Sequence, residues 1–134
     1  MKLNHECVRS ILLTVEECDN PNQKFSPEIL KNSNRFDEFE TEEIRYAIQK
    51  LFEAGFVNVM RVQDPAVIGG EYFVDSITWS GHEFLDNIRN ESAWNQVMEA
   101  LKENSISASL SIVGKFVSGI VDSGVKKITE SFFS

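Results

Sequence analysis

The sequence predicts a mostly helical α+β fold, with a winged-helix-like domain over residues 1–90 and a helical C-terminal extension over residues 91–134. Three observations predict it. Several segments carry apolar residues at the three- and four-residue spacing of a helix. Residues 56–62 and 72–74 alternate like the two strands of a hairpin, with turn-forming residues between them. The second strand then runs directly into a capped helix at Thr78, as many winged-helix domains do after a wing of two or three antiparallel strands.

Two helices are predicted before the helix that leads into the hairpin. Residues 3–18 carry one apolar stripe, and the run at 19–22, which contains proline and two asparagines, ends the helix. Ser26 and Pro27 begin a shorter helix, with serine as the cap and proline at the first position. An extended segment over residues 25–29 is the competing interpretation.

The third predicted helix runs from Thr41, as its N-cap, to Ala54, and Gly55 ends it. Its inward face is predicted to consist of Ile44, Ala47, Ile48, Leu51 and Phe52. The hairpin loop is predicted over residues 64–70, with the Gly69-Gly70 pair at the tip of the wing.

The segment after the hairpin is predicted to be a helix capped by Thr78, with Ser80 and Glu83 as an overlapping capping box. Two tryptophans, Trp79 and Trp94, could stack on a ligand. Core positions that clamp the wing to the C-terminal helices are the preferred interpretation.

The C-terminal extension carries an apolar stripe at alternating four- and three-residue steps. The residues assigned to oligomerisation are Leu110, Val113, Val117 and Ile120. The preferred interpretation is a helix that packs against a second copy of the chain. The alternatives are a helix that folds back over its own domain, and surface attachment to a membrane.

Composition limits the classes of partner. The formal charge is −8, from 21 acidic and 13 basic residues, and an acidic surface repels the phosphate backbone of nucleic acids. Cys7 and Cys18 would lie about 16 Å apart along one helix, too far for a disulfide. Free thiols, an N-terminus without an apolar signal segment and the lack of a long apolar run predict a cytoplasmic protein without a transmembrane segment.

The run T-W-S-G-H-E-F-L-D-N-I-R-N-E-S-A-W-N, residues 78–95, closely resembles the signature of an uncharacterised family. That family is a domain of unknown function found in small proteins of prophages and mobile elements in Gram-positive bacteria. The resemblance extends to the first helix and to residues 43–56, whereas residues 25–39 match poorly. It implies a winged-helix-like fold and a phage or mobile-element setting, but no activity, cofactor or catalytic residue.

Two functions follow from these patterns. The preferred one is a non-enzymatic interaction module that binds a protein partner or itself. The alternative is a DNA-binding transcriptional regulator that inserts helix 41–54 into the major groove and uses the wing. In that alternative Arg45 and Gln49 would read base edges, Lys50 would reach phosphate and Arg61 would assist from the wing. The three glutamates on the same helix argue against DNA binding.

Neither catalysis nor metal binding is expected. His82 and Glu83 are adjacent, but no second histidine follows four residues later, as metalloprotease spacing requires. His5 is the only other histidine, and it belongs to another predicted helix. Since no nucleophile, base and orienting group stand together, the sequence predicts neither an enzyme nor a bound cofactor.

Overall fold

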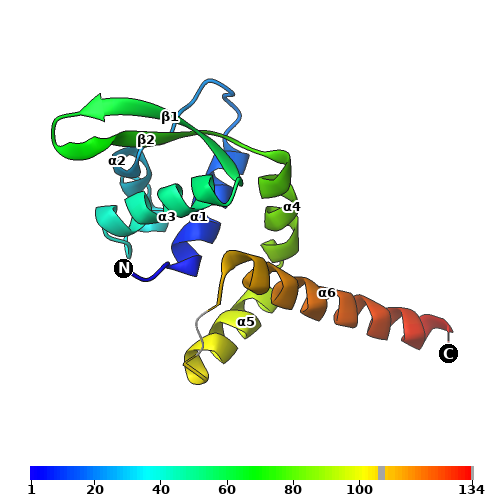
Figure 1. The fold of residues 1–134 in the computed structure, drawn as a ribbon. Coiled ribbons are helices and arrows are strands. Elements are labelled where there is room, and N and C mark those ends of the chain that lie inside the picture. The colour runs from blue at the N-terminus through cyan, green and yellow to red at the C-terminus, as the bar shows by residue number, and fades with distance from the viewer. Residues whose placement is uncertain (106–107, 134) are drawn as a thin grey trace. The chain divides into compact units, whose positions relative to one another are not determined.

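The computed structural model describes residues 1–105 and 108–133, with side chains through residue 122. The chain divides into two compact units, residues 1–82 and 83–134, and each is described separately. The division falls inside helix α4 (Trp79–Ile88), and the domain boundary predicted at residue 90 stays a prediction. Figure 1 shows the elements of both units.

The first unit is an α+β arrangement with a two-stranded antiparallel sheet, in agreement with the predicted class. Its elements, before α4 begins, are α1 (His5–Glu17), α2 (Pro27–Lys31), the 3-10 helix η1 (Asn34–Phe36), α3 (Thr41–Glu53), β1 (Val57–Asp64) and β2 (Val67–Ile77).

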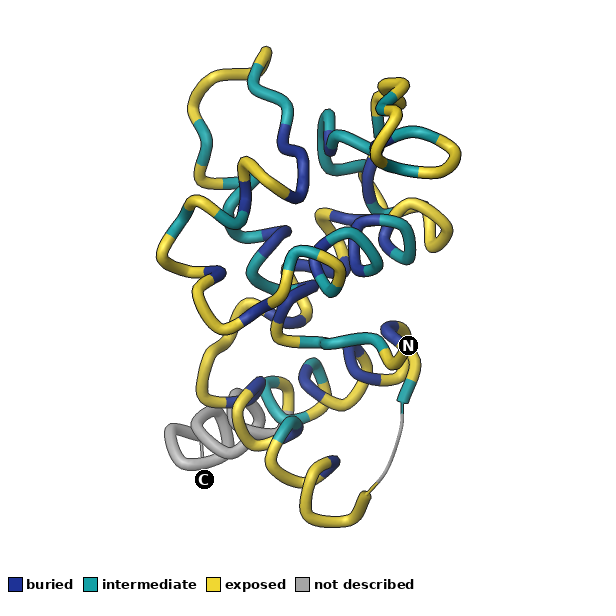
Figure 2. Tube along the Cα trace, turned by 90° about the vertical axis from the view of Figure 1, so that its left-hand side faces the viewer, coloured by how far each residue is buried: buried dark blue, intermediate teal, exposed yellow. Residues whose placement is uncertain are grey.

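The core of this unit forms where α1 packs against α3. Figure 2 shows the buried residues in dark blue. Asn4 begins α1, since its side chain accepts a hydrogen bond from the Cys7 N–H at 3.2 Å. The two helices bury their apolar stripes, which consist of Cys7, Val8, Ile11 and Leu12 on α1 and Ile44, Ala47, Ile48 and Leu51 on α3. Burial of a large aliphatic side chain contributes about 1.5–3 kcal/mol, so this contact is the main source of the unit's stability.

Both conformations predicted for residues 25–29, a short helix and an extended segment, occur in part. The hydroxyl of Ser26 accepts a hydrogen bond from the Ile29 N–H at 3.1 Å, and Pro27 takes the first helical position, so the short helix is confirmed. Phe25 is nevertheless extended and bridges Val74 of β2, with backbone N–H to O distances of 3.0 and 2.8 Å. The extended interpretation therefore holds only for the residue before the cap.

Helix α3 starts one residue earlier than predicted. Its N-cap is Glu40, not Thr41, and the Glu40 N–H donates to the Glu43 carboxylate at 3.1 Å. A carboxylate three residues into the helix satisfies the cap's amide, which moves the cap away from the threonine hydroxyl. Gly55 ends the helix with φ +79°, as predicted for a residue in the left-handed region.

The hairpin turn is shorter than predicted. Asp64 pairs with Val67, so the turn is Pro65-Ala66 and β2 includes Gly69 and Gly70. The glycine pair therefore does not form the tip of the wing. It lies within β2 at the register shift between the pairs Val62–Glu71 and Asp64–Val67, where three residues of β2 stand opposite one residue of β1.

The junction between β2 and α4 explains the I-T-x-x-G pattern. The Thr78 hydroxyl accepts from the Gly81 N–H at 3.0 Å and donates to the Gly55 carbonyl at 2.6 Å, which confirms the predicted cap. A Cβ atom on Gly81 would lie 2.0 Å from the carbonyl oxygen of Phe56, so only glycine fits. Trp79, predicted to be a core residue, is instead 80% exposed, because capping by Thr78 leaves the first helical residue outside the core.

The second unit contains the end of α4, α5 (Glu91–Glu103) and α6 (Leu110–Phe133). Asn90 caps α5 by accepting from the Ala93 N–H at 2.9 Å. Helices α5 and α6 pack together, and Trp94 is 1% exposed, as predicted for a core residue. Gly114 allows α6 to approach the Phe84 ring, which would lie 3.1 Å from an added Cβ. Within the described residues, every helix is too short or too polar to span a bilayer.

Candidate functional site

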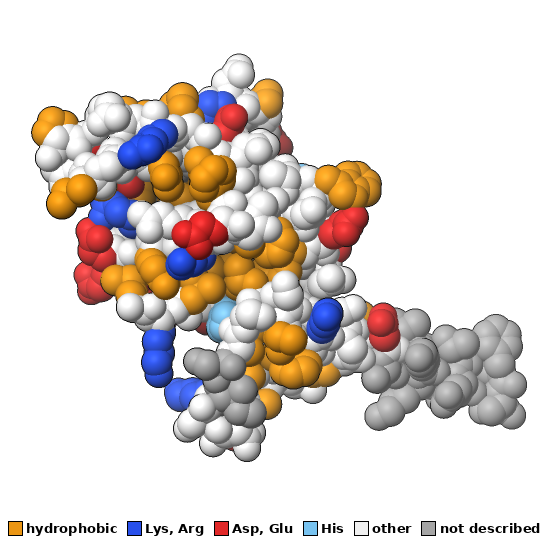
Figure 3. Space-filling model, in the orientation of Figure 1, with side chains coloured by type: hydrophobic (Ala, Val, Ile, Leu, Met, Phe, Trp, Pro, Cys, Tyr) orange, Lys and Arg blue, Asp and Glu red, His pale blue; other side chains and the backbone are white. Residues whose placement is uncertain are grey.

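A groove between α3 and the hairpin is the most distinctive surface of the first unit. It encloses about 290 Å³ and is lined by Gln49, Phe52 and Glu53 of α3 and by Arg61, Ile68, Gly69, Gly70 and Tyr72 of the hairpin. We call this set of residues the hairpin groove. Figure 3 shows hydrophobic side chains between the hairpin and α3, next to a basic side chain on the hairpin.

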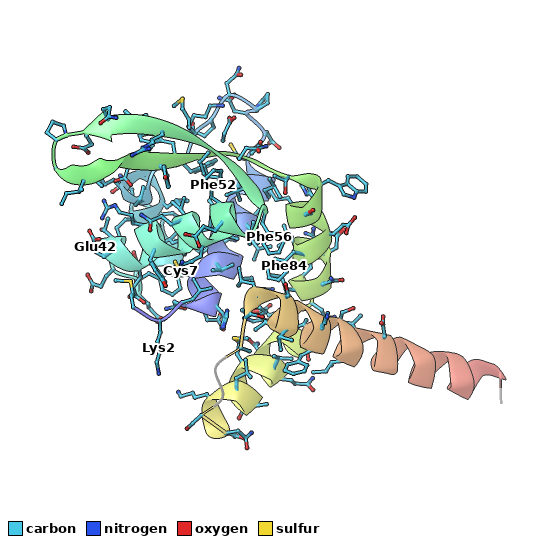
Figure 4. All side chains as sticks on the ribbon, viewed as in Figure 1. Lys2, Cys7, Glu42, Phe52, Phe56 and Phe84 are labelled. Atoms are coloured by element: carbon cyan, nitrogen blue, oxygen red, sulfur yellow. The ribbon has the colours of Figure 1, made fainter. Side chains whose placement is uncertain are left out.

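The apolar side of the hairpin groove is unusually open to solvent. The Phe52 and Tyr72 rings lie 5.8 Å apart in an edge-to-face arrangement, and Phe52 points from α3 toward the hairpin (Figure 4). Phe52 is 45% exposed and Ile68 is fully exposed. The prediction that Phe52 belongs to the inward face of its helix is therefore wrong, since its ring packs against the hairpin at the edge of the core.

The glycine pair in β2 shapes the opposite wall of the hairpin groove. Gly69 and Gly70 have φ values of +84° and +88°, which L side chains rarely adopt. A Cβ on Gly70 would lie 2.8 Å from the Val62 carbonyl oxygen. The two glycines thus bring the strands close together, and the guanidinium of Arg61 lies against backbone, donating from Nε to the Gly69 carbonyl.

Arg61 is the groove's unneutralised cation. Its guanidinium carbon lies 5.8 Å from the centre of the Tyr72 ring, a cation–π geometry. Among the residues that the structure describes, no carboxylate pairs with it. The carboxylate that lines the groove, Glu53, accepts from Lys50 at 2.8 Å. The hairpin groove is therefore positively charged within a protein whose formal charge is −8.

Arg45 is held inside the unit and does not line the hairpin groove. Its Nε lies 3.1 and 3.2 Å from the two carboxylate oxygens of Glu71, its Nη2 lies 2.8 Å from one of them, and Nη1 also binds Glu42. The side chains of Arg45 and Glu71 are 13% and 5% exposed. The hydrogen bonds from Arg45 to Glu71 are the main reason that the pKa of Arg45 is raised. This pair fastens β2 to α3 and occupies the guanidinium edge that a base contact would need.

The four residues predicted to contact DNA thus have different environments. Lys50 pairs with Glu53 and lies 5.3 Å from the centre of the Tyr46 ring, and the hydrogen bond to Glu53 raises the pKa of Lys50. Gln49 and Arg61 meet in the hairpin groove, whereas Arg45 is bound to Glu71. Base contacts by these residues remain a prediction.

The residues predicted for oligomerisation lie in the second unit. Leu110, Val113 and Val117 are buried there, and Ile120 is half-buried. Ile120 and Phe116 line a cavity of about 310 Å³ with residues of α5. The first three are core residues of the second unit, in which α5 packs against α6. Oligomerisation itself remains a prediction.

The candidate catalytic and metal-binding side chains do not form a recognisable centre. Cys18, Asp75 and His82 line one cavity of about 270 Å³, and within the described residues no group of three or more metal-ligating side chains gathers. Cys7 and Cys18 are free thiols, as predicted. Burial, with a smaller effect of Glu43, raises the pKa of Cys7 to about 12, so this thiol is protonated and unreactive at neutral pH.

Comparison with known proteins adds a family. A family model described as a hypothetical protein (DUF2513) matches residues 2–107. The chain belongs to this family. A relative in Haemophilus influenzae, described as an uncharacterized protein, is 28% identical over 121 residues, which cover 90% of this chain and 96% of the relative. No solved structure matches the chain. The family is one of unknown function, as the resemblance predicts, while the prophage setting remains a prediction.

Proposed function

We propose that this chain is a non-enzymatic, winged-helix-like interaction module that binds a protein partner or itself. The order of elements supports a winged helix: α1, the Phe25 bridge, α2, α3 and then the hairpin that pairs with that bridge at Val74. A setting in prophage or mobile-element genes is part of the proposal, on the resemblance of residues 78–95.

The hairpin groove is the single observation that carries the proposal. Interfaces are enriched in aromatic residues and arginine, which make up a large part of this groove. Phe52 and Ile68 expose apolar surface that a free protein would otherwise bury, and a fully exposed isoleucine at the edge of a groove contributes nothing to folding. A partner that covers this surface gains the hydrophobic free energy that the isolated unit leaves unused.

DNA binding is the second candidate, and the same element order supports it, because winged helices also bind DNA. The charges favour it less. Arg45 and Lys50 are paired with carboxylates, which lowers the number of phosphates that α3 could neutralise. A salt-dependent shift of duplex DNA that Lys50→Ala and Arg61→Ala both weaken would support DNA binding over the interaction module.

Site-specific photo-crosslinking tests the proposal. A photoreactive amino acid replaces Ile68 of the hairpin groove in one variant, and exposed Glu28 of α2 in a control. In cells of the source organism, position 68 should form a discrete protein adduct that Phe52→Ala reduces, and position 28 should not. A ladder that depends on the concentration of the pure protein would identify a second copy as the partner. Equal, diffuse labelling at both positions, with no adduct in the pure protein, would contradict the proposal.

A further inference from the structure

The size of the hairpin groove limits what it can hold. Cavities for drug-sized ligands and cofactors usually enclose roughly 300–1,000 Å³. At about 290 Å³ this groove falls at the small end of that range, and it is open at the surface through Ile68 and Phe52. These dimensions suit one apolar side chain of a bound polypeptide better than a whole cofactor.

The walls of the hairpin groove determine the chemistry of that side chain. The Phe52 and Tyr72 rings pack edge to face with their centroids 5.8 Å apart and form one aromatic surface, and Ile68 adds an aliphatic surface on the hairpin. An apolar side chain that packs on these surfaces loses water contact without leaving a polar group unpaired.

The charge of the hairpin groove determines which charged group of the bound peptide lies next to that apolar side chain. Lys50 neutralises Glu53, and no carboxylate among the described residues pairs with Arg61. The groove therefore has an excess of one positive charge. A guanidinium binds a carboxylate with paired hydrogen bonds and discriminates strongly against a second cation.

Arg61 is also held in position before any partner arrives. Its Nε donates to the Gly69 carbonyl, and its guanidinium lies over the Tyr72 ring. An added Cβ on Gly69 would lie 3.2 Å from Nη2, so a glycine at this position gives the guanidinium room. Because the arginine is already ordered, binding a carboxylate costs less side-chain entropy than it would for a free arginine.

We infer that the hairpin groove binds a peptide segment of a partner protein in which an apolar residue stands next to an aspartate or glutamate. The apolar side chain packs on the surface that Phe52, Ile68 and Tyr72 form, and the carboxylate pairs with Arg61. This inference rests on the proposed function and names the chemistry of the partner.

A displayed library of random peptides, selected on the whole chain, tests the inference. The enriched peptides should share an apolar residue adjacent to an acidic one. Selection on Arg61→Glu should replace the acidic residue by lysine or arginine. The matched control Arg35→Glu, which changes an exposed arginine elsewhere in the unit, should leave the enriched motif unchanged.

Affinity measurements complete the test. A synthetic peptide with the enriched motif should bind Arg61→Glu about tenfold more weakly than the unmodified chain, and added salt should weaken binding to the latter. Ile68→Asp should lower affinity as well, and because Ile68 is fully exposed this variant should fold normally.

Three results would overturn the inference. They are enriched peptides without acidic residues, a motif unaffected by Arg61→Glu, and preferential binding of a labelled oligothymidine over every selected peptide. Its failure is distinct from failure of the proposed function. A crosslinked partner at position 68 without any preference for acidic peptides would leave the interaction module standing and remove this inference.

Discussion

The ion pair between Arg45 and Glu71 makes a sharp prediction about folding. Arg45→Met retains most of the aliphatic volume and removes the guanidinium, which leaves the Glu71 carboxylate 5% exposed and without its cation. The structure assigns Arg45 to the attachment of β2 to α3, so we expect this variant to lower the free energy of unfolding even in the absence of any ligand.

The size of the effect can be worked out from two limits. Breaking a buried ion pair by removing one partner costs about 3–5 kcal/mol. The stranded carboxylate can instead take up a proton, and protonating an ordinary glutamic acid side chain at pH 7 costs about 3.7 kcal/mol, which caps the loss. We therefore expect a loss of about 3 kcal/mol at pH 7, which should shrink by up to about 1.4 kcal/mol for each unit that the pH falls.

Urea unfolding, followed by circular dichroism between about pH 5 and pH 7, measures this loss. Arg35→Met is the matched control, because Arg35 makes a comparable pair with Glu17 at 3.0 Å that is solvent-exposed. It should cost less than about 1 kcal/mol. The double variant Arg45→Met/Glu71→Leu should recover most of the stability, since an apolar pair replaces the ion pair. An Arg45→Met variant as stable as the control, or a loss independent of pH, would refute the structural role assigned to this pair.

Three further predictions concern other parts of the fold. Gly81→Ala should lower the free energy of unfolding, measured by thermal unfolding, by at least about 3 kcal/mol, because the added Cβ would lie 2.0 Å from a backbone oxygen. Gly119→Ala, with open space around it, should instead stabilise α6 by up to about 1 kcal/mol. The pKa of Glu43 is lowered, chiefly by a hydrogen bond from Asn4, so its stabilisation is complete above the ordinary value of 4.5 and disappears as the pH falls through the lowered one. Glu43→Gln should therefore flatten the acid side of the stability profile, and an unchanged profile would contradict this. Trp94→Ala should cost about 3–5 kcal/mol in chemical unfolding, and a loss below about 1 kcal/mol would show that the site is not core.

Local patterns predicted most of the elements. The helix at residues 41–54 appears within one residue at each end because its apolar spacing is regular and Gly55 can adopt a positive φ. The hairpin was predicted with too long a loop, for a physical reason. A Gly-Gly pair is compatible with a turn and with a bulge inside a strand, and both need the left-handed region. Only the pairing of Asp64 with Val67 decides between them.

The site was harder to predict because it depends on contacts between distant residues. Arg45 and Glu71 are 26 residues apart, and nothing local indicates that they meet. Phe52 follows the apolar spacing of its helix, yet it lies at the edge of the inward face, where the hairpin takes the place of α1 as its neighbour. Gln49, a predicted reader of base edges, and Arg61, predicted to assist from the wing, lie together beside exposed apolar groups.

The tail illustrates the limit of a periodic stripe as evidence for a partner. A stripe shows that one face of a helix must be covered, and a second copy or the same chain can cover it equally well. Here α5 covers Leu110, Val113 and Val117, so these residues are already used. Ile112 and Phe116 remain exposed on the described part of α6. Within residues 110–119 of α6, self-association that leaves the unit intact would therefore use these two residues rather than the three buried ones.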